Sequence, residues 1–116
     1  MPRTKRDDMP NLHLSPLEED LLTILSGSRE LYSVEFERVL KEVCGRTQDF
    51  GSIYPTLRNM VKRGLLSTRW GEETPEVPGG PRRRYYRITD PGREALRLAE
   101  DRRLRLKDWA LAPEGG

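Results

Sequence analysis

Three consecutive arginines are the residues of this sequence best suited to binding chemistry. Arg82, Arg83 and Arg84 follow glycines and a proline in the stretch "GGPRRRYYRIT". Guanidinium groups gathered beside a turn can contact the backbone phosphates of double-stranded DNA or enter its minor groove. Because side chains alternate along a strand, we expect neighbouring arginines to face opposite sides, so that not all three bind. The alternative is a charged run that only keeps the surface soluble.

A second set of polar residues lies in "GSIYPTLRNMVKRGLL", residues 51–66, whose pattern is mostly helical. In a helix-turn-helix the later helix enters the major groove, and its N-terminal part meets the base edges. Ser52, Tyr54 and Thr56 would offer hydroxyl groups to bases or phosphates at that end. The segment is therefore predicted to be a recognition helix.

Amide and cationic side chains follow further along the same segment. Arg58 and Asn59 are the candidates for base contact, since Arg pairs well with guanine and Asn with adenine. Lys62 lies near the end of the segment, where it would contact a phosphate or complement the negative end of the helix. The sequence leaves both roles open for Lys62.

A proline inside this helical segment needs a structural reason, because Pro55 has no backbone N–H. If the helix starts near Ser52, no hydrogen bond is lost, because the first N–H groups of a helix have no partner within it. If it starts at Asp49, the bond to the Gly51 carbonyl is lost and a bend is expected. A stiff helix end pressed against DNA would explain the proline, and a helix start that merely tolerates it is the alternative.

Charge is distributed unevenly along the 116 residues. The net charge is +2, but residues 15–44 sum to −4 and residues 51–87 sum to +5. Such separation is found in surfaces that meet a polyanion and in ordinary solvated surfaces alike. With 34% hydrophobic and 34% charged residues, the chain buries a limited core, so we expect a second subunit to supply further buried surface.

The sequence lacks the residue clusters of an enzyme or a metal protein. One histidine, His13, and one cysteine, Cys44, provide neither a zinc site nor an internal disulfide. No glycine-rich phosphate loop is present, and no stretch approaches the ~20 apolar residues of a membrane span. We therefore expect no catalysis, no cofactor, no metal and no membrane partner. The unpaired cysteine and the lack of an apolar segment near the N-terminus fit a cytoplasmic location.

Helical periodicity defines two segments before the recognition helix. Ser15 and Glu18 would form a capping box at the start of the first, which Gly27 ends. Ser33 is the expected cap of the second, which Gly45 ends. The spacing predicts that the second helix turns these residues inward: Val34, Phe36, Val39, Leu40, Val43 and the small apolar Cys44.

After the third helical run, Asp49 to Arg63, the apolar period becomes that of a strand. "LLSTRW" and "RRYYRIT" alternate on either side of the loop "GEETPEVPGGPR", which predicts an antiparallel β-hairpin. Trp70 would pack in the core or across the hairpin, and Tyr85 and Tyr86 would pack within it. Three helices followed by a hairpin predict a winged helix-turn-helix.

A final helix starts after its cap, Thr89, and has little of its own chain to pack against. We expect it to self-associate, with docking onto the first helix as the alternative. The predicted dimerisation stripe comprises Ala95, Leu98, Arg102, Leu106 and Trp109. Two copies would hold two recognition helices about one DNA turn, roughly 34 Å, apart on a palindromic site.

The predicted fold is mainly α with a small antiparallel β-hairpin, a winged helix-turn-helix plus a C-terminal dimerisation helix. A flexible arm is expected over residues 1–13 and the winged-helix domain over residues 14–89. The dimerisation helix would span residues 90–110, with a disordered tail over residues 111–116.

Two segments resemble the PadR family of bacterial transcriptional regulators: Tyr54-Pro55-x-Leu57 and Arg84-Tyr85-Tyr86-x-Ile88-Thr89. The resemblance extends from about Leu14 to Leu98. It implies a winged-helix repressor that is dimeric through its last helix, with Tyr54 on the DNA-binding helix and Arg82 to Arg84 in the wing. Some family members bind aromatic compounds near the dimer helices, so the resemblance also implies that a small aromatic effector is conceivable.

Our main hypothesis is a dimeric repressor that binds double-stranded DNA at a palindromic promoter site. One alternative is a protein-interaction adaptor on a winged-helix scaffold, because the acidic Glu72, Glu73 and Glu76 beside the wing would repel phosphate. Another is an effector-binding regulator that uses Trp109. The stretches "SRELYSVEF" and "TRWGEE" also resemble cyanobacterial members of the family, which adds a circadian clock-gene repressor of the period extender type.

Overall fold

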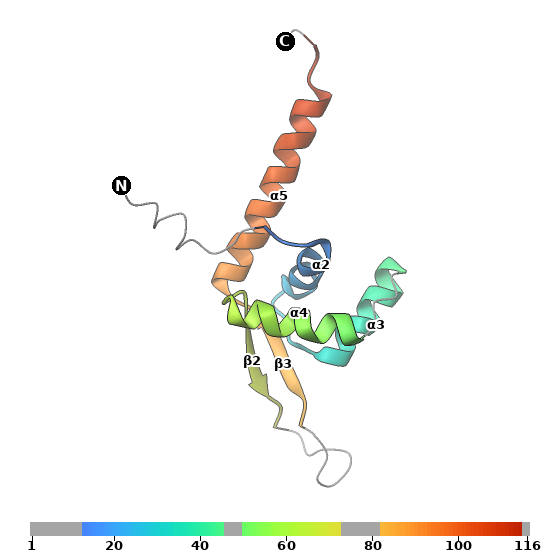
Figure 1. Ribbon diagram of the computed structural model, residues 1–116, viewed down its shortest axis with the longest axis vertical. Coiled ribbons are helices and arrows are strands. Elements are labelled where there is room, and N and C mark those ends of the chain that lie inside the picture. Colours follow the sequence, from blue (N-terminus) through green and yellow to red (C-terminus); the bar gives the residue numbers. More distant parts are fainter. Residues whose placement is uncertain (1–12, 46–49, 73–81, 115–116) are drawn as a thin grey trace, which may run out of the picture.

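The computed structural model describes residues 13–45, 50–72 and 82–114. Its elements follow in the order α2 (Pro16–Leu25), β1 (Leu31–Tyr32), α3 (Ser33–Cys44), α4 (Phe50–Lys62), β2 (Leu66–Trp70), β3 (Arg84–Ile88) and α5 (Asp90–Leu111). Helices α2 to α4 surround one core, the hairpin projects at one end, and α5 extends at the other (Figure 1). This is the predicted winged helix-turn-helix with an added C-terminal helix. The expected arm, apart from His13, and the last two residues of the expected tail lie outside the described residues.

The first helix begins as its capping residues predict. The Glu18 N–H donates to the Ser15 hydroxyl at 3.1 Å, and the Ser15 N–H donates to the Glu18 carboxylate at 2.9 Å. Leu21, Leu22 and Leu25 are fully buried on the inner side of α2. The capping box thus directs the apolar face of the helix into the core.

The second helix differs from the prediction at both ends. Its N-cap is Tyr32, whose N–H donates to the Glu35 carboxylate at 3.0 Å, because β1 runs directly into α3 and places Ser33 inside the helix. Val34 is 52% exposed, because the side of α3 that meets the core is filled by Phe36 and Leu40, four residues apart.

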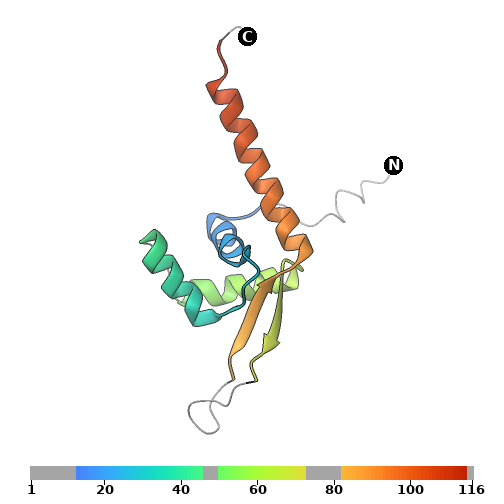
Figure 2. The same cartoon turned by 180° about the vertical axis from the view of Figure 1, so that it is seen from behind.

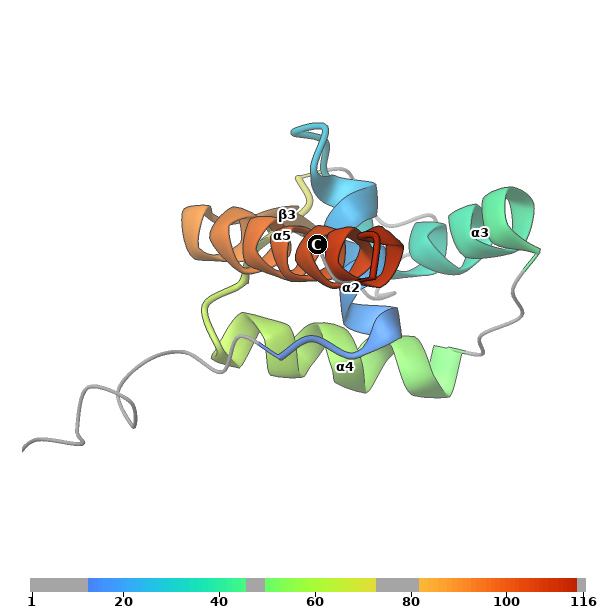
Figure 3. The same cartoon turned by 90° about the horizontal axis from the view of Figure 1, so that it is seen from above.

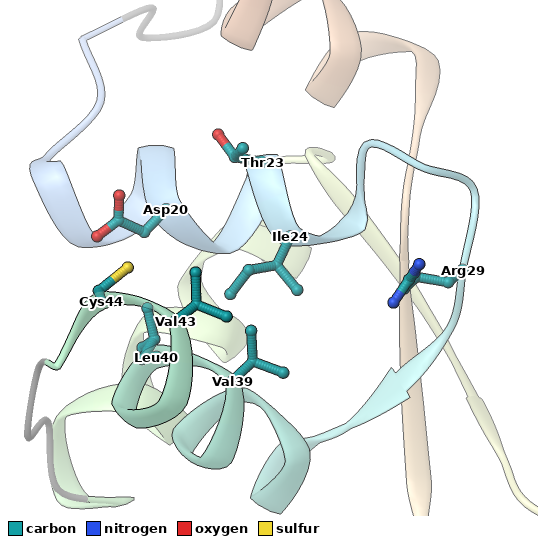
Figure 4. A pocket seen from close by; sticks show the side chains of 8 residues that line it. All are labelled: Asp20, Thr23, Ile24, Arg29, Val39, Leu40, Val43 and Cys44. Carbon is teal, nitrogen blue, oxygen red and sulfur yellow. The ribbon is translucent and has the colours of Figure 1, made fainter.

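The predicted burial of Val43 and Cys44 is also wrong. Val43 is 76% exposed, and Cys44 is exposed as well. Both lie in the last turn of α3, where they line the open hollow between α2 and α3 (Figure 4). Gly45 ends the helix with a left-handed backbone (φ +65°), as predicted.

Helix α4 buries one side and leaves the other to solvent. Ile53, Leu57 and Met60 are fully buried, as their spacing predicts. Because α4 begins at Phe50, Pro55 lies in its second turn and has no N–H for the Gly51 carbonyl. The candidate caps Thr47 and Asp49 lie outside the described residues.

The sheet has three antiparallel strands in the order β1-β3-β2, so β3 is central. The predicted hairpin is formed by β2 and β3, with Leu66 opposite Ile88 and Trp70 opposite Arg84. Tyr86 is fully buried on the inner face of β3. The sequence analysis missed β1, because two residues next to a helix are too short to show a strand period.

The first turn of α5 is joined to the end of α4 through the backbone. The Thr89 N–H donates to the Leu65 carbonyl, and the Thr89 hydroxyl donates to the Gly64 carbonyl at 2.6 Å. The same hydroxyl accepts from the Gly92 N–H at 3.0 Å and so caps α5, as predicted. Gly92 lies so close that a Cβ there would stand 2.2 Å from the Leu65 carbonyl oxygen.

The two halves of the 22-residue α5 have different surroundings. The first half packs on α2, where Ala95, Leu96 and Ala99 are buried (Figure 3). The second half extends away from the domain, at the opposite end of the molecule from the hairpin (Figure 2). Docking on the first helix therefore describes the first half, and only the second half is left for another partner.

The contact at Gly92 predicts a large effect of a single methyl group. Gly92→Ala should lower the free energy of unfolding by about 1–3 kcal/mol, because backbone and not a flexible side chain occupies the space. Urea unfolding followed by circular dichroism measures the change. Gly27→Ala is the matched control, because nothing lies within 4 Å of its Cβ position, and it should change stability by less than about 0.5 kcal/mol. Equal stability of the two variants would contradict the assigned contact.

Candidate nucleic-acid interface

The side of α4 opposite the core carries the predicted recognition residues. Ile53, Leu57 and Met60 point inward, which leaves these residues along the exposed side: Gly51, Pro55, Arg58, Asn59 and Lys62. Toward the N-terminal end, Gly51 and Pro55 are the exposed residues among those from position 51 onward. Backbone can therefore approach another surface closely there, while longer polar side chains follow.

The three hydroxyl groups of the predicted site are less available than the exposed residues. Ser52, Tyr54 and Thr56 are each half-buried. The Thr56 hydroxyl donates to the Ser52 carbonyl at 2.8 Å, so its proton is already used within α4. The Tyr54 ring lies beside Arg58, whose guanidinium carbon is 5.8 Å from the ring centroid.

Cationic side chains from α4 and the hairpin meet in a small hollow. Arg58 and Lys62 of α4 line it together with Arg84 of β3, and the remaining wall is formed by Val61 and Tyr86. The hollow has a volume of about 180 Å³. The fold thus brings together cations that are more than 20 positions apart in the sequence.

The three wing arginines separate, as strand alternation predicts. The Arg84 guanidinium lies 4.8 Å from the Trp70 ring, on the side of β3 that faces α4. The Arg83 guanidinium lies 4.6 Å from the Tyr32 ring. Arg82 donates two hydrogen bonds to the Gly71 carbonyl, the shorter at 2.7 Å, and so ties the two strands together at the loop end of the hairpin. Only Arg84 of the three lines the hollow with Arg58.

The outer face of the sheet holds an aromatic group that the sequence analysis did not identify. Tyr32 and Tyr85 meet edge to face with ring centroids 5.8 Å apart, and Arg69 lies 4.7 Å from the Tyr85 centroid. Arg69 also pairs with Glu30 at 2.8 Å, and its hydrogen bonds hold the pKa of Glu30 below the usual value. This group belongs to the strand pair β1–β3, which no local sequence pattern indicates.

The predicted dimerisation residues fall into two groups. Ala95 is fully buried within its own domain, and Leu98 is half-buried. Arg102, Leu106 and Trp109 are exposed on the second half of α5, where Trp109 is 81% exposed. Two further exposed apolar residues on this half were not in the predicted stripe: Leu104 and Leu111.

An apolar hollow of about 300 Å³ lies between α2 and α3 (Figure 4). Ile24, Val39 and Leu40 form much of its wall, with Asp20 and Arg29 at separate positions around it. Trp109, the residue we considered for an aromatic effector, does not line this hollow. Of the acidic loop that favoured an adaptor, Glu73 and Glu76 lie outside the described residues.

Residues 13–45, 50–72 and 82–114 form neither a metal-binding cluster nor a membrane-spanning helix. No three His, Cys, Asp or Glu side chains gather there as a metal ion would require. None of the helices in these ranges combines the length and the apolar character needed to cross a bilayer.

Comparison with known proteins places this fold among transcriptional regulators. The family model described as "Transcriptional regulator PadR-like family" matches residues 21–98. A PadR-like transcription factor from Bacteroides fragilis is 29% identical with a TM-score of 0.71, covering 81% of this chain and 85% of that chain. A PadR family transcriptional regulator from Eggerthella lenta is 28% identical with a TM-score of 0.68, covering 81% and 77%.

A more distant structure was solved with bound nucleic acid. It is Bacillus subtilis PadR in complex with operator DNA, at 20% identity and a TM-score of 0.62, covering 90% of this chain and 51% of that chain. At that identity the similarity shows the fold alone. No curated protein matches the chain. The matched residues, 21–98, include half of α2 and all of α3, α4 and the hairpin strands, and we conclude that the chain belongs to the PadR-like family of transcriptional regulators.

Proposed function

We propose that this chain is a dimeric repressor that binds a palindromic promoter site through α4 and the β2–β3 hairpin. The observation that carries the proposal is the meeting of Arg58 and Lys62 on α4 with Arg84 on β3. None of these three cations has a carboxylate partner among the described residues. Unpaired cations on one surface of a winged helix supply the electrostatic part of DNA binding.

Within this surface, α4 would enter the major groove. Asn59 is exposed, and its side-chain amide makes no hydrogen bond within the described residues, so the amide is free to pair with an adenine edge. Arg58 turns toward the hollow with Lys62, so we now assign it to the DNA backbone and not to a base. Gly51 and Pro55 leave the first turns of α4 bare, which permits close approach to the bases.

The second half of α5 would join two copies. Its exposed side carries Leu106 and Trp109, whose burial against a second copy would remove apolar surface from water. The start of the same helix is joined to the end of α4 by the bonds at Thr89. Pairing two α5 helices therefore sets the distance between two α4 helices, which is what a palindromic site requires. Occupation of a promoter by this dimer blocks polymerase without any catalysis.

Selection of binding sites from random DNA tests the proposal. The wild-type protein should select a palindrome whose half-sites lie about one DNA turn, roughly 34 Å, apart. Asn59→Ala should relax the preference at one base pair in each half-site, at a cost of ~1–3 kcal/mol for the preferred base. Arg58→Ala is the matched comparison. It should weaken binding by the same factor for every DNA sequence, because a phosphate contact does not depend on the base. Recovery of no common sequence by the wild type would reject sequence-specific binding.

The salt dependence of DNA binding tests whether the hairpin contacts the DNA backbone. Arg84→Gln should flatten the slope of log K against log salt concentration by about 0.9, the value of one neutralised phosphate. Fluorescence anisotropy of labelled duplex DNA between low and moderate salt measures the slope. Arg87→Gln is the control, because Arg87 is exposed on the opposite face of β3 and should leave the slope unchanged. Equal slopes for Arg84→Gln and the wild type would remove this arginine from the interface.

Sedimentation velocity tests the dimer. Leu106→Asp combined with Trp109→Asp should raise the dissociation constant of the dimer at least about 100-fold, because each large apolar side chain contributes about 1.5–3 kcal/mol when buried. The fold of the domain should be unaffected, because both residues are exposed in the single chain. Lys107→Glu, also exposed and one residue from Leu106, serves as the control. A double variant that dimerises as the wild type does would show that α5 pairs elsewhere.

A further inference from the structure

We propose that the hollow between α4 and β3 is a binding site for one phosphate group, held by Arg58, Lys62, Arg84 and the hydroxyl of Tyr86. These side chains, with Val61, form its lining, and the lining contains no carboxylate. A site with three cations and one neutral hydroxyl suits a compact anion. The identification of the anion as a DNA backbone phosphate rests on the proposed function. The presence of an anion site in the hollow does not depend on that function.

Two buried polar atoms at this site have no hydrogen-bond partner among the described residues. They are the hydroxyl oxygen of Tyr86 and Nε of Arg84. Tyr86 is fully buried, and it is the largest side chain in the core. Buried polar groups in folded proteins nearly always have partners, so two unpaired atoms on residues that line one hollow call for an acceptor from outside the chain. A phosphate oxygen accepts from both kinds of donor.

Packing alone does not explain the hydroxyl of Tyr86. Its ring meets the Phe36 ring edge to face, with centroids 6.1 Å apart, and phenylalanine would fill the same space. Phenylalanine would also avoid the cost of an unpaired buried hydroxyl. Packing therefore leaves the hydroxyl oxygen without a hydrogen bond, which a bound phosphate would supply.

The phenol is in the correct protonation state to donate. Burial raises the pKa of Tyr86, and the neighbouring Tyr54 raises it further, while the charge of Arg84, its close approach to the hydroxyl and the charge of Arg58 act in the opposite direction. The approach of Arg84 to the hydroxyl does not have the geometry of a hydrogen bond. The net effect is upward, so the hydroxyl keeps its proton at neutral pH. It can therefore donate to a phosphate oxygen beside the guanidinium groups.

The location of the hollow fits a backbone phosphate of bound DNA. One wall comes from α4, which would lie in the major groove, and the other from β3, whose hairpin would reach the adjacent minor groove. The DNA strand that separates two grooves must pass between such a helix and hairpin. Its phosphate would face the corner where Arg58, Lys62 and Arg84 meet.

Entry of the phosphate requires a small movement of side chains. The Tyr86 hydroxyl and Arg84 Nε are both closed off from solvent. Arg58 is exposed and Arg84 is half-buried, and both have long side chains with several rotatable bonds. We expect their guanidinium groups to shift toward the phosphate and open the path to the Tyr86 hydroxyl.

The first test removes only the hydroxyl. Tyr86→Phe should weaken binding of the selected duplex about tenfold, the effect of one hydrogen bond to a charged group, as measured by fluorescence anisotropy. The salt slope should not change, because a neutral hydroxyl releases no counterion. In the absence of DNA, the Tyr86→Phe variant should unfold at the same temperature as the wild type or at a higher one. Weaker DNA binding would then reflect the missing hydrogen bond and not a loss of folded protein. Tyr85→Phe, one residue away and outside the hollow, is the control and should bind normally.

The second test locates the phosphate. Single phosphates of the duplex are replaced in turn by neutral methylphosphonates, and the ratio of wild-type to Tyr86→Phe affinity is measured for each duplex. At one position in each half-site the ratio should fall from about ten to about one, because the hydroxyl loses its charged acceptor there. A constant ratio at all positions would overturn the assignment to a backbone phosphate.

A third measurement separates a DNA phosphate from a free one. Inorganic phosphate should raise the unfolding temperature of the wild type more than chloride at equal ionic strength, and Tyr86→Phe should lose this difference. If only this result appears, the hollow binds a free phosphate-bearing ligand. If neither DNA nor phosphate responds to Tyr86→Phe, the site is rejected, even where DNA binding itself is intact. If the wild type selects no DNA but phosphate stabilises it through Tyr86, the site stands and the proposed function fails.

Discussion

The close approach of Gly92 to the Leu65 carbonyl is the contact on which the arrangement of the molecule depends. At this point the end of α4, the start of β2 and the first turn of α5 meet. Thr89 bonds to the backbone on the same side, so the junction is held by hydrogen bonds and by the absence of a side chain. A larger residue at position 92 would push α5 away from α4. The direction of α5 relative to α4 is therefore set by backbone packing and not by long side chains.

Helix α2 adds a second connection between the same two elements. Glu18 pairs with Arg63 just beyond α4 at 2.9 Å, in a largely buried position. The adjacent Glu19 pairs with Arg103 in the second half of α5. Two neighbouring carboxylates of α2 thus hold the end of α4 and the last helix to one short helix. A change in the pairing of α5 would reach α4 through α2 as well as through the junction at Gly92.

The cations of the chain divide according to whether the fold neutralises them. Arg63 and Arg69 have carboxylate partners within the domain, at Glu18 and Glu30 respectively. Their charge is used to hold elements together, and less of it is available to a polyanion. The cations at the α4–β3 hollow have no such carboxylate among the described residues, and two of the polar atoms there are buried without partners. Carboxylates within the domain neutralise the first group, whereas the second group keeps its charge, as the proposed phosphate site requires.

The sequence by itself determined the helices, the hairpin and the family, because caps, periodicity and turns are local properties. Ser15 and Thr89 cap their helices as predicted, and the order of helices and hairpin follows from the change of apolar period. Only the tertiary structure decided which polar residues meet. It placed Arg84 and not Arg83 beside α4, buried Ala95 in its own domain, and formed β1 from two residues with no period of their own. Such contacts join residues far apart in the chain, and no pattern along the sequence records which side of a strand or helix will face a distant partner.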